Sequence, residues 1–249
     1  MLSLNSIKKI KSLKTKKGRY TEKLFLIEGK RSVKEYLLKS DLVNEIVVSE
    51  LETKNYNSLL DLCSKKKIKV SIVPENISKK LSDTKTPSGL LATCKINLLV
   101  QKEYNSSRWL YLYKIKNPGN LGTILRSAAW FNIKNIALSK DCTDFFNNKV
   151  VRSAMGAHIY LNIHKGVQVD EFVKNNYLIV GADPNGNNTV EQIDLSKKIV
   201  LCLGGESEGF DNVIIKKINK LISIKKFGHG ESLNVAMAGS ILMNYLSKK

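Results

Sequence analysis

Short apolar runs alternate with amphipathic stretches along the first third of the chain. The strand-like runs are residues 24–27, 46–48, 68–73 and 90–95, and the helix-like ones are residues 33–38 and 59–63. Such alternation predicts a compact α/β unit. The residues that follow mix polar and charged side chains without a clear period, so we expect residues 1–97 to form one domain and residues 98–108 a linker.

Residues 109–249 carry a second α/β series. Its strand-like runs are residues 109–115, 135–138, 159–163, 177–181, 198–203 and 221–224, with helix-like segments between them. Short apolar runs bounded by turn residues are typical of a mostly parallel sheet that is buried on both faces. The last helix is the best defined, because apolar side chains recur along it at Leu233, Met237, Ile241 and Tyr245, with Leu242 and Leu246 beside them.

Composition restricts the class of protein. At 249 residues and 43% hydrophobic content, the chain can bury a sizeable core. Its apolar runs fall far short of the roughly 20 residues that a membrane helix needs, which predicts a soluble, cytoplasmic protein without a membrane partner. The cysteines are dispersed and only three histidines accompany them, so we expect buried or idle thiols and no metal centre: Cys63, Cys94, Cys142 and Cys202.

The charge of the chain is strongly positive. Lys and Arg number 41 against 22 Asp and Glu, a formal net charge of +19. Such a chain suits a polyanionic partner, because each phosphate that Lys or Arg neutralises releases counterions. Most of these cations are Lys, which is also consistent with nucleotide bias in the coding genome, although the charge favours a nucleic-acid partner. The basic first 23 residues, Arg19 among them, are consistent with an RNA-gripping arm, a targeting presequence or a solvated end, although presequences favour Arg over Lys.

The first candidate site follows the strand-like run at residues 109–115. The turn Asn117-Pro118-Gly119-Asn120 leads into a helix whose apolar stripe leaves Arg126 outside it. A loop and a helix N-terminus at the end of a parallel strand are where α/β folds bind ligands, since backbone N–H groups and the helix dipole point outward there. Taken alone, an arginine in this position is more commonly a solvated helix charge.

Two further segments combine glycines or small residues with polar ones. In residues 203–210, Gly204 and Gly205 end a buried strand, where the absence of side chains lets the backbone approach a bound molecule. Their spacing matches neither the dinucleotide nor the triphosphate fingerprint. In residues 231–240, Ser232 is expected to cap the last helix, and the small residues after it allow close packing within the fold or across a dimer.

Taken in this order, residues 117–126, 203–210 and 224–236 resemble the three motifs of SpoU-type (TrmH-type) RNA ribose 2′-O-methyltransferases in the SPOUT superfamily. Residues 151–157 resemble the intermediate segment of that family, and residues 24–29 and 86–92 resemble its substrate-binding front domain. The likeness spans nearly the whole chain.

The resemblance implies a fold, a cofactor and partners. The catalytic domain of that family is an α/β trefoil knot that binds S-adenosyl-L-methionine and works as a homodimer. The front domain is a smaller α/β fold similar to kink-turn-binding ribosomal proteins, which would dock RNA. We therefore expect an enzyme that methylates a ribose 2′-hydroxyl in RNA, with ribosomal RNA as the first candidate by family analogy.

The resemblance also assigns the site residues position by position. The polar residues of the active site would be Asn120, Arg126, Glu206, Ser232 and Asn234. The residues that wrap the methyl donor, mainly through their backbone, would be Gly204, Gly205, Ile224 and Leu233.

The chain departs from the family pattern at one place. Relatives usually have Ile-Pro-Met where this chain has Ile224-Lys225-Lys226, and Pro fixes φ whereas Lys does not. Two alternatives remain open at this point. One is a transfer RNA 2′-O-methyltransferase, and the other is a non-catalytic RNA-binding or assembly factor that keeps the fold.

Overall fold

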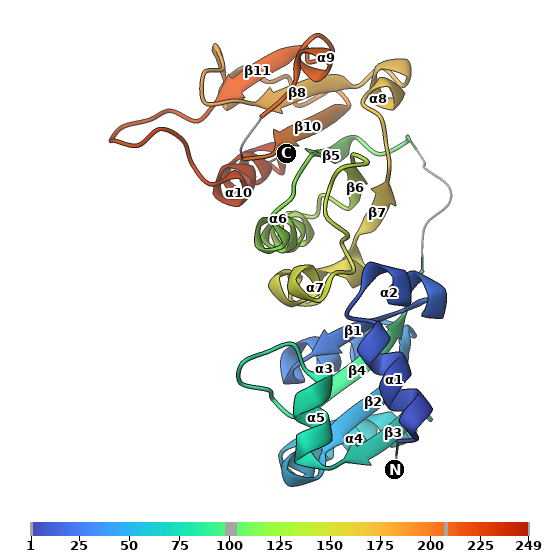
Figure 1. Ribbon diagram of the computed structural model, residues 1–249. Helices are drawn as coiled ribbons and strands as arrows, with labels where there is room; N and C mark the ends of the chain where they lie inside the picture. Colours follow the sequence, from blue (N-terminus) through green and yellow to red (C-terminus); the bar gives the residue numbers. More distant parts are fainter. Residues whose placement is uncertain (1, 98–103, 207–208, 249) are drawn as a thin grey trace. The chain divides into compact units, whose positions relative to one another are not determined.

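The computed structural model describes residues 2–97, 104–206 and 209–248 (Figure 1). The chain folds as two compact units. Unit 1 comprises Met1–Asn97 and Asp144–Ile159, and unit 2 comprises Leu98–Thr143 and Tyr160–Lys249. Segment 144–159, which the sequence analysis assigned to the catalytic domain, therefore folds with unit 1. Of the predicted linker, residues 98–103 lie outside the described residues.

Unit 1 is built on a four-stranded mixed sheet in the order β1-β4-β2-β3. Strand β4 runs antiparallel to β1 and β2, whereas β2 and β3 are parallel. The elements in chain order are α1 Leu4–Ser12, α2 Lys16–Glu22, β1 Leu24–Glu28, α3 Lys30–Lys39, β2 Val43–Ser49, η1 Glu50–Tyr56, α4 Asn57–Lys65, β3 Lys69–Val73, α5 Glu75–Leu81 and β4 Leu90–Lys95, followed by α7 Asn148–Ala154 and the 3₁₀ turn η2 Ala157–Tyr160.

Both faces of this sheet are covered, because the apolar residues of β1 alternate between them. Leu24 and Leu26 pack with Ile10 of α1 and with Leu81 at the end of α5. Phe25 points to the opposite face, where its ring centroid lies 6.0 Å from that of Tyr36 in α3 and 4.7 Å from that of Phe146. The aromatic contact with Phe146 joins segment 144–159 to the sheet.

A buried ion pair provides a second connection to this segment. Arg19 is 2% exposed, its Nη2 lies 2.5 Å from Oδ2 of Asp144, and its Nη1 donates to the carbonyl of Leu13 at 2.9 Å. Tyr20 donates its hydroxyl proton to Oδ1 of the same carboxylate at 3.1 Å. Arg19 belongs by sequence to the basic N-terminal segment, but its guanidinium is buried and is not available to RNA. The exposed cations of that segment include Lys8, Lys11, Lys16 and Lys17.

Unit 2 contains a seven-stranded sheet in the order β7-β6-β5-β10-β8-β11-β9, and every pairing in it is parallel. The predicted parallel sheet is thus confirmed. The elements in chain order are β5 Arg108–Tyr113, α6 Pro118–Trp130, β6 Asn135–Leu138, β7 Asn162–Lys165, α8 Asp170–Lys174, β8 Leu178–Ala182, β9 Asn188–Thr189, η3 Val190–Gln192, β10 Ile199–Gly204, α9 Asn212–Ile215, β11 Lys220–Ser223 and α10 Val235–Leu246.

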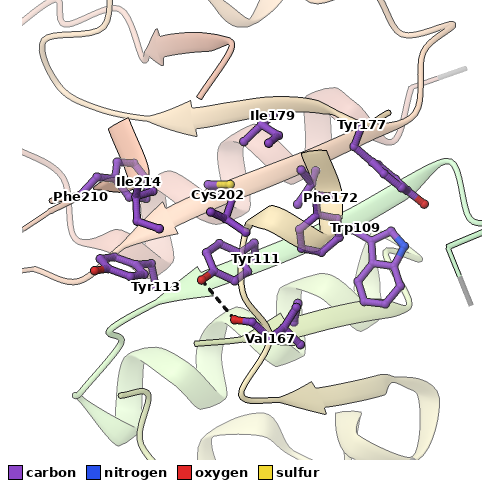
Figure 2. Close-up of a cluster of buried hydrophobic side chains, with 13 residues drawn as sticks. Trp109, Tyr111, Tyr113, Val167, Phe172, Tyr177, Ile179, Cys202, Phe210 and Ile214 are labelled. Atoms are coloured by element: carbon purple, nitrogen blue, oxygen red, sulfur yellow. Dashed lines mark hydrogen bonds between the residues drawn. The ribbon is translucent and has the colours of Figure 1, made fainter. Parts of the chain in front are cut away.

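Aromatic side chains fill one face of this sheet (Figure 2). Trp109 and Tyr111 of β5 pack against Phe172 of α8, and the Tyr111 hydroxyl donates to the carbonyl of Val167 at 3.4 Å. Helices α6 and α10 pack against each other, and α10 also contacts β10. A Cβ added to Gly239 would lie 2.6 Å from Cδ1 of Leu203, so this small residue serves close packing within the fold.

Two predicted element boundaries are wrong. The strand predicted at residues 159–163 begins at Asn162, because Met155 and Gly156 adopt positive φ angles of 50° and 92° after α7 and the chain then forms the turn η2. The last helix is capped by Asn234 and not by Ser232, since the Asn234 side chain accepts the backbone N–H of Ala236 at 2.9 Å.

The last helix is apolar on two sides. Its predicted stripe lies exposed at Leu233, Met237 and Ile241. The side that packs into unit 2 is formed by Ala236, Gly239, Leu242, Met243 and Leu246, so Leu242 and Leu246 of the predicted apolar face are buried. A helix that is apolar all round is normally covered all round, so the exposed stripe points to a further contact.

Further observations bear on the predicted class of protein. Within the described residues, no helix combines the length and the apolar character needed to cross a membrane. The predicted unpaired thiols are confirmed: Cys63, Cys94 and Cys202 are buried and Cys142 is half-buried, all as free cysteines. Residues 2–97, 104–206 and 209–248 include no group of three His, Cys, Asp or Glu side chains placed to bind a metal ion.

Candidate active site

Three loops of unit 2 leave the same edge of its sheet. They follow β5, β10 and β11, which all run in one direction (Figure 1). The carboxyl edge of a parallel sheet is where α/β folds bind ligands, because the loops and helix N-termini there are free to vary. Eight of the nine predicted site residues lie in these loops or in the helices that follow them, and the ninth, Gly204, is the last residue of β10.

The loop after β5 ends in a well-defined helix start. Asn117 is the N-cap of α6, and its Oδ1 accepts the backbone N–H of Gly119 at 2.8 Å and that of Asn120 at 3.3 Å. Pro118 occupies the first helical position, where its missing N–H costs nothing. The sequence pattern predicts a turn over this segment and not a cap, although an Asn directly before a Pro is a known signal for a helix start.

Asn120 joins three chain segments at this edge. Its Nδ2 donates to Oε1 of Glu206, 86 residues further along the chain. Its Oδ1 accepts a hydrogen bond from Nδ2 of Asn234, 114 residues away, at 3.1 Å. The structure thus brings together three of the five predicted catalytic residues. Because Asn234 uses its own Oδ1 to cap α10, one side chain both starts that helix and ties it to α6.

The other two predicted catalytic residues lie outside this network. Ser232 is exposed in the segment before α10. Arg126 is exposed on α6, opposite the predicted stripe, whose members Leu121, Ile124 and Leu125 are buried as expected. Within the described chain, Arg126 takes part in no hydrogen bond or ion pair. Its guanidinium is therefore available to an external anion.

The two glycines predicted for the donor site, Gly204 and Gly205, have a structural role within the fold that the sequence did not reveal. A Cβ on Gly204 would lie 2.9 Å from the carbonyl carbon of Gly209, and one on Gly205 would lie 2.6 Å from the carbonyl oxygen of Lys114. The protein's own backbone therefore occupies the space on the Cβ side of both glycines. This close approach holds the end of β10 against the loop after β5.

The remaining donor-site candidates offer apolar surface at the same edge. Ile224 directly follows β11 and is half-buried, and Leu233 is exposed just before α10. Backbone groups combined with apolar side chains are the lining that small-molecule sites normally use, so these loops fit a bound nucleoside.

A charged cluster lies beside the two glycines. Tyr113 donates its hydroxyl proton to Oδ2 of Asp211, and Nζ of Lys114 lies 3.4 Å from the same oxygen. The hydrogen bond from Tyr113, together with the backbone N–H of Ile214 and the nearby ammonium, lowers the pKa of the Asp211 carboxyl. Burial and Asp211 raise the pKa of the Tyr113 hydroxyl, so the phenol stays protonated and the carboxylate ionised.

Comparison with known proteins identifies the family. Residues 107–244 match the SpoU rRNA Methylase family, and residues 5–92 match the MRM3-like substrate binding domain. The chain belongs to the SpoU rRNA methylase family. The resemblance stated from three short motifs is therefore confirmed over most of the chain.

Individual relatives of this SpoU-family chain cover nearly all of it. It is 30% identical over 243 residues to "23S rRNA (guanosine(2553)-2′-O)-methyltransferase RlmP" of Bacillus subtilis, covering 96% of this chain and 95% of that one. A putative RNA methyltransferase of the TrmH family from Porphyromonas gingivalis superposes with a TM-score of 0.83 at 29% identity, covering 99% and 98%. The chain also shares its fold with an AdoMet-bound rRNA methyltransferase from Sinorhizobium meliloti. The two superpose with a TM-score of 0.83 at 23% identity, covering 99% of this chain and 96% of that one.

Family membership confirms several predictions. The chain has an α/β SpoU methyltransferase domain with an N-terminal substrate-binding domain, its methyl donor is S-adenosyl-L-methionine, and its substrate is RNA. The roles of the nine site residues stay predictions, and the network at Asn120 supports them only by placing three of them together.

Proposed function

We propose that the chain methylates the ribose 2′-hydroxyl of a guanosine in 23S ribosomal RNA, in the cytoplasm. The observation that carries this proposal is the network in which Asn120 binds Glu206 and Asn234, because it assembles three distant segments at the ligand-binding edge of the sheet. The choice of RNA and base rests on the likeness to RlmP, whose name gives that substrate.

The reaction must overcome the weak acidity of a ribose hydroxyl. S-adenosyl-L-methionine supplies an electrophilic methyl group, and the new bond joins the 2′-oxygen to that methyl as its bond to sulfur breaks. The protein's first contribution is to hold the hydroxyl in line, since positioning alone supplies a large part of such an acceleration. In our proposal Glu206 and Asn234, both oriented by Asn120, fix the ribose, and the exposed Ser232 hydroxyl provides a further contact.

Arg126 provides the second contribution in this mechanism. A guanidinium is always protonated in proteins, so it is a poor proton acceptor. We therefore assign Arg126 to the phosphate next to the ribose and to the negative charge that develops on the 2′-oxygen, with the proton leaving to phosphate or water. Its exposed position on α6, without a partner in the described residues, is consistent with that role.

Methyl transfer by the purified protein tests this function. We expect radioactive methyl from S-adenosyl-L-methionine to appear in 23S rRNA isolated from cells that lack the gene, and not in rRNA from cells that carry it. Mass spectrometry of nuclease fragments should then find one 2′-O-methylguanosine. Label in transfer RNA alone would establish the tRNA alternative. Absence of both label and donor binding in calorimetry would establish the non-catalytic RNA-binding factor.

We further propose that the enzyme is a homodimer through the exposed faces of α6 and α10. Met237 is 60% exposed on α10 within the apolar stripe, and Trp130 is 84% exposed at the end of α6. Large exposed apolar side chains on two adjoining helices are typical of a surface that another subunit covers. Arg126 lies one helical turn before Trp130 on the same side of α6, so such a dimer would place Arg126 at the subunit boundary.

Charges introduced into this face test the dimer. We expect the double substitution Met237→Lys and Ile241→Lys to convert the protein to a monomer in sedimentation velocity at micromolar concentration, because two ammonium groups would have to be desolvated in the contact. Val213→Lys is the matched control, since Val213 is similarly exposed on α9, outside the proposed face. A double variant that sediments like the wild type would refute the proposed interface.

A further inference from the structure

The loop between β11 and α10 exposes an unusual side chain. Phe227 is 87% exposed, more than any other large apolar residue in the described part of the chain. All residues from 225 to 234 are solvent-accessible, and Figure 1 shows this loop projecting from the body of unit 2. An aromatic ring exposed to water in a polar loop is a candidate contact for a binding partner.

Two lysines directly precede Phe227, and one of them contacts its ring. Nζ of Lys225 lies 5.0 Å from the centroid of the Phe227 ring. Nζ of Lys226 donates to the carbonyl of Gly230 at 3.0 Å and so closes the loop. An exposed aromatic face next to cations is the combination with which proteins hold single-stranded nucleic acid, because bases stack on the ring and phosphates meet the charges.

Both ends of the loop lie at the predicted active site. It begins at Ile224, a donor-site candidate, and it ends at Asn234, which is hydrogen-bonded to Asn120. An RNA strand whose reacting ribose lies near Asn120 continues on both sides of that nucleotide, so a neighbouring base is available to the exposed Phe227 ring.

The departure from the family pattern also favours RNA binding at this loop. Where relatives usually have Pro-Met after the isoleucine, this chain places Lys225 and Lys226, two cations directly before Phe227. Replacing an apolar pair by two cations next to an exposed ring adds affinity for phosphate at this point.

We propose that Phe227 stacks on an unpaired base of the RNA substrate beside the nucleotide that is methylated, while Lys225 binds a neighbouring phosphate. This inference rests on the proposed function, because it requires RNA at the carboxyl edge of the unit 2 sheet. Unpaired bases splay out of RNA loops and stack on aromatic side chains. A phenyl ring has no hydrogen-bonding group, so Phe227 positions the strand without selecting the base.

Binding of an unmodified 23S rRNA transcript to the full-length protein tests this role. We expect Phe227→Ala to raise the Kd for that RNA by about 5- to 150-fold. Phe227→Trp, which keeps a stacking face, should stay within about threefold of the wild type. Phe227→Leu keeps apolar bulk without an aromatic face and should resemble the Ala variant. If the Leu variant binds RNA like the wild type, stacking is refuted. Lys225→Gln should make the slope of log Kd against log salt shallower by about 0.7.

Two measurements on the same variants distinguish RNA binding by this loop from donor binding and from subunit contact. Calorimetry with S-adenosylhomocysteine should give an unchanged affinity, and sedimentation should give an unchanged assembly. Loss of donor affinity, or dissociation of subunits, with RNA binding retained would overturn the inference. An active wild type with an equally active Phe227→Ala variant would refute only the role of Phe227. A wild type that neither binds the donor nor transfers methyl would refute the proposed function itself.

Discussion

Replacing Arg126 with Ala is expected to lower kcat for methyl transfer by about 100- to 1,000-fold, the usual cost of removing one group that stabilises a developing oxyanion. The free energy of unfolding should stay within about 0.5 kcal/mol of the wild type, because Arg126 is exposed and contacts no partner in the described residues. Single-turnover kinetics with saturating donor and RNA would measure the chemical step directly.

Two companion variants sharpen this test of Arg126. Arg126→Lys keeps the charge and removes the planar fork, and we expect it to recover only a small part of the lost rate. Near-normal activity of that variant would mean that the fork is unnecessary. Lys134→Ala removes an exposed cation just before β6, at the amino edge of the sheet, and should leave kcat unchanged. If Lys134→Ala slowed the reaction as much as Arg126→Ala, the effect of Arg126 would come from the overall positive charge of the protein and not from its position.

Removing the buried guanidinium of unit 1 is expected to have the largest effect on stability. Arg19→Ala leaves the Asp144 carboxylate buried without its counter-charge, which should lower the free energy of unfolding by about 3–5 kcal/mol. Urea denaturation followed by circular dichroism would measure the loss. Hydrogen exchange should show which segments lose stability. We expect faster exchange in segment 144–159 and unchanged exchange in α10.

The matched control for Arg19 lies on the same helix. Lys17→Ala removes an exposed cation of α2 and should change stability by less than about 0.5 kcal/mol. An Arg19→Ala variant as stable as Lys17→Ala would show that the pair contributes nothing. Faster exchange throughout both units would instead mean that they unfold together, and it would contradict a loss confined to unit 1.

Much of the architecture follows from the local pattern of the sequence. The short apolar runs of residues 109–224 predict a parallel sheet because strands buried on both faces must be apolar throughout, and the observed sheet is entirely parallel. The stripe that begins at Leu121 predicts which side of α6 is buried, since helical periodicity alone sets that side. The order of three motifs was sufficient to indicate the family, because each motif is a short local segment.

Apart from the local caps at Asn117 and Asn234, the features that the sequence did not predict depend on partners far away in the chain. Arg19 resembles its exposed lysine neighbours until Asp144, 125 residues later, meets it. Ser and Asn are equally good helix N-caps, so residue type alone does not choose between Ser232 and Asn234. The hydrogen bond between Asn234 and Asn120 exists only in the folded chain.

The sequence alone therefore determined the family, the parallel sheet and the residues available for chemistry, because these depend on residue type and local spacing. The tertiary structure alone decided that segment 144–159 folds with unit 1, that Gly204 and Gly205 accommodate the protein's own backbone, and that the Met237 stripe of α10 is left exposed. Periodicity shows that a side chain is apolar or charged, but the surface it meets is set by long-range packing.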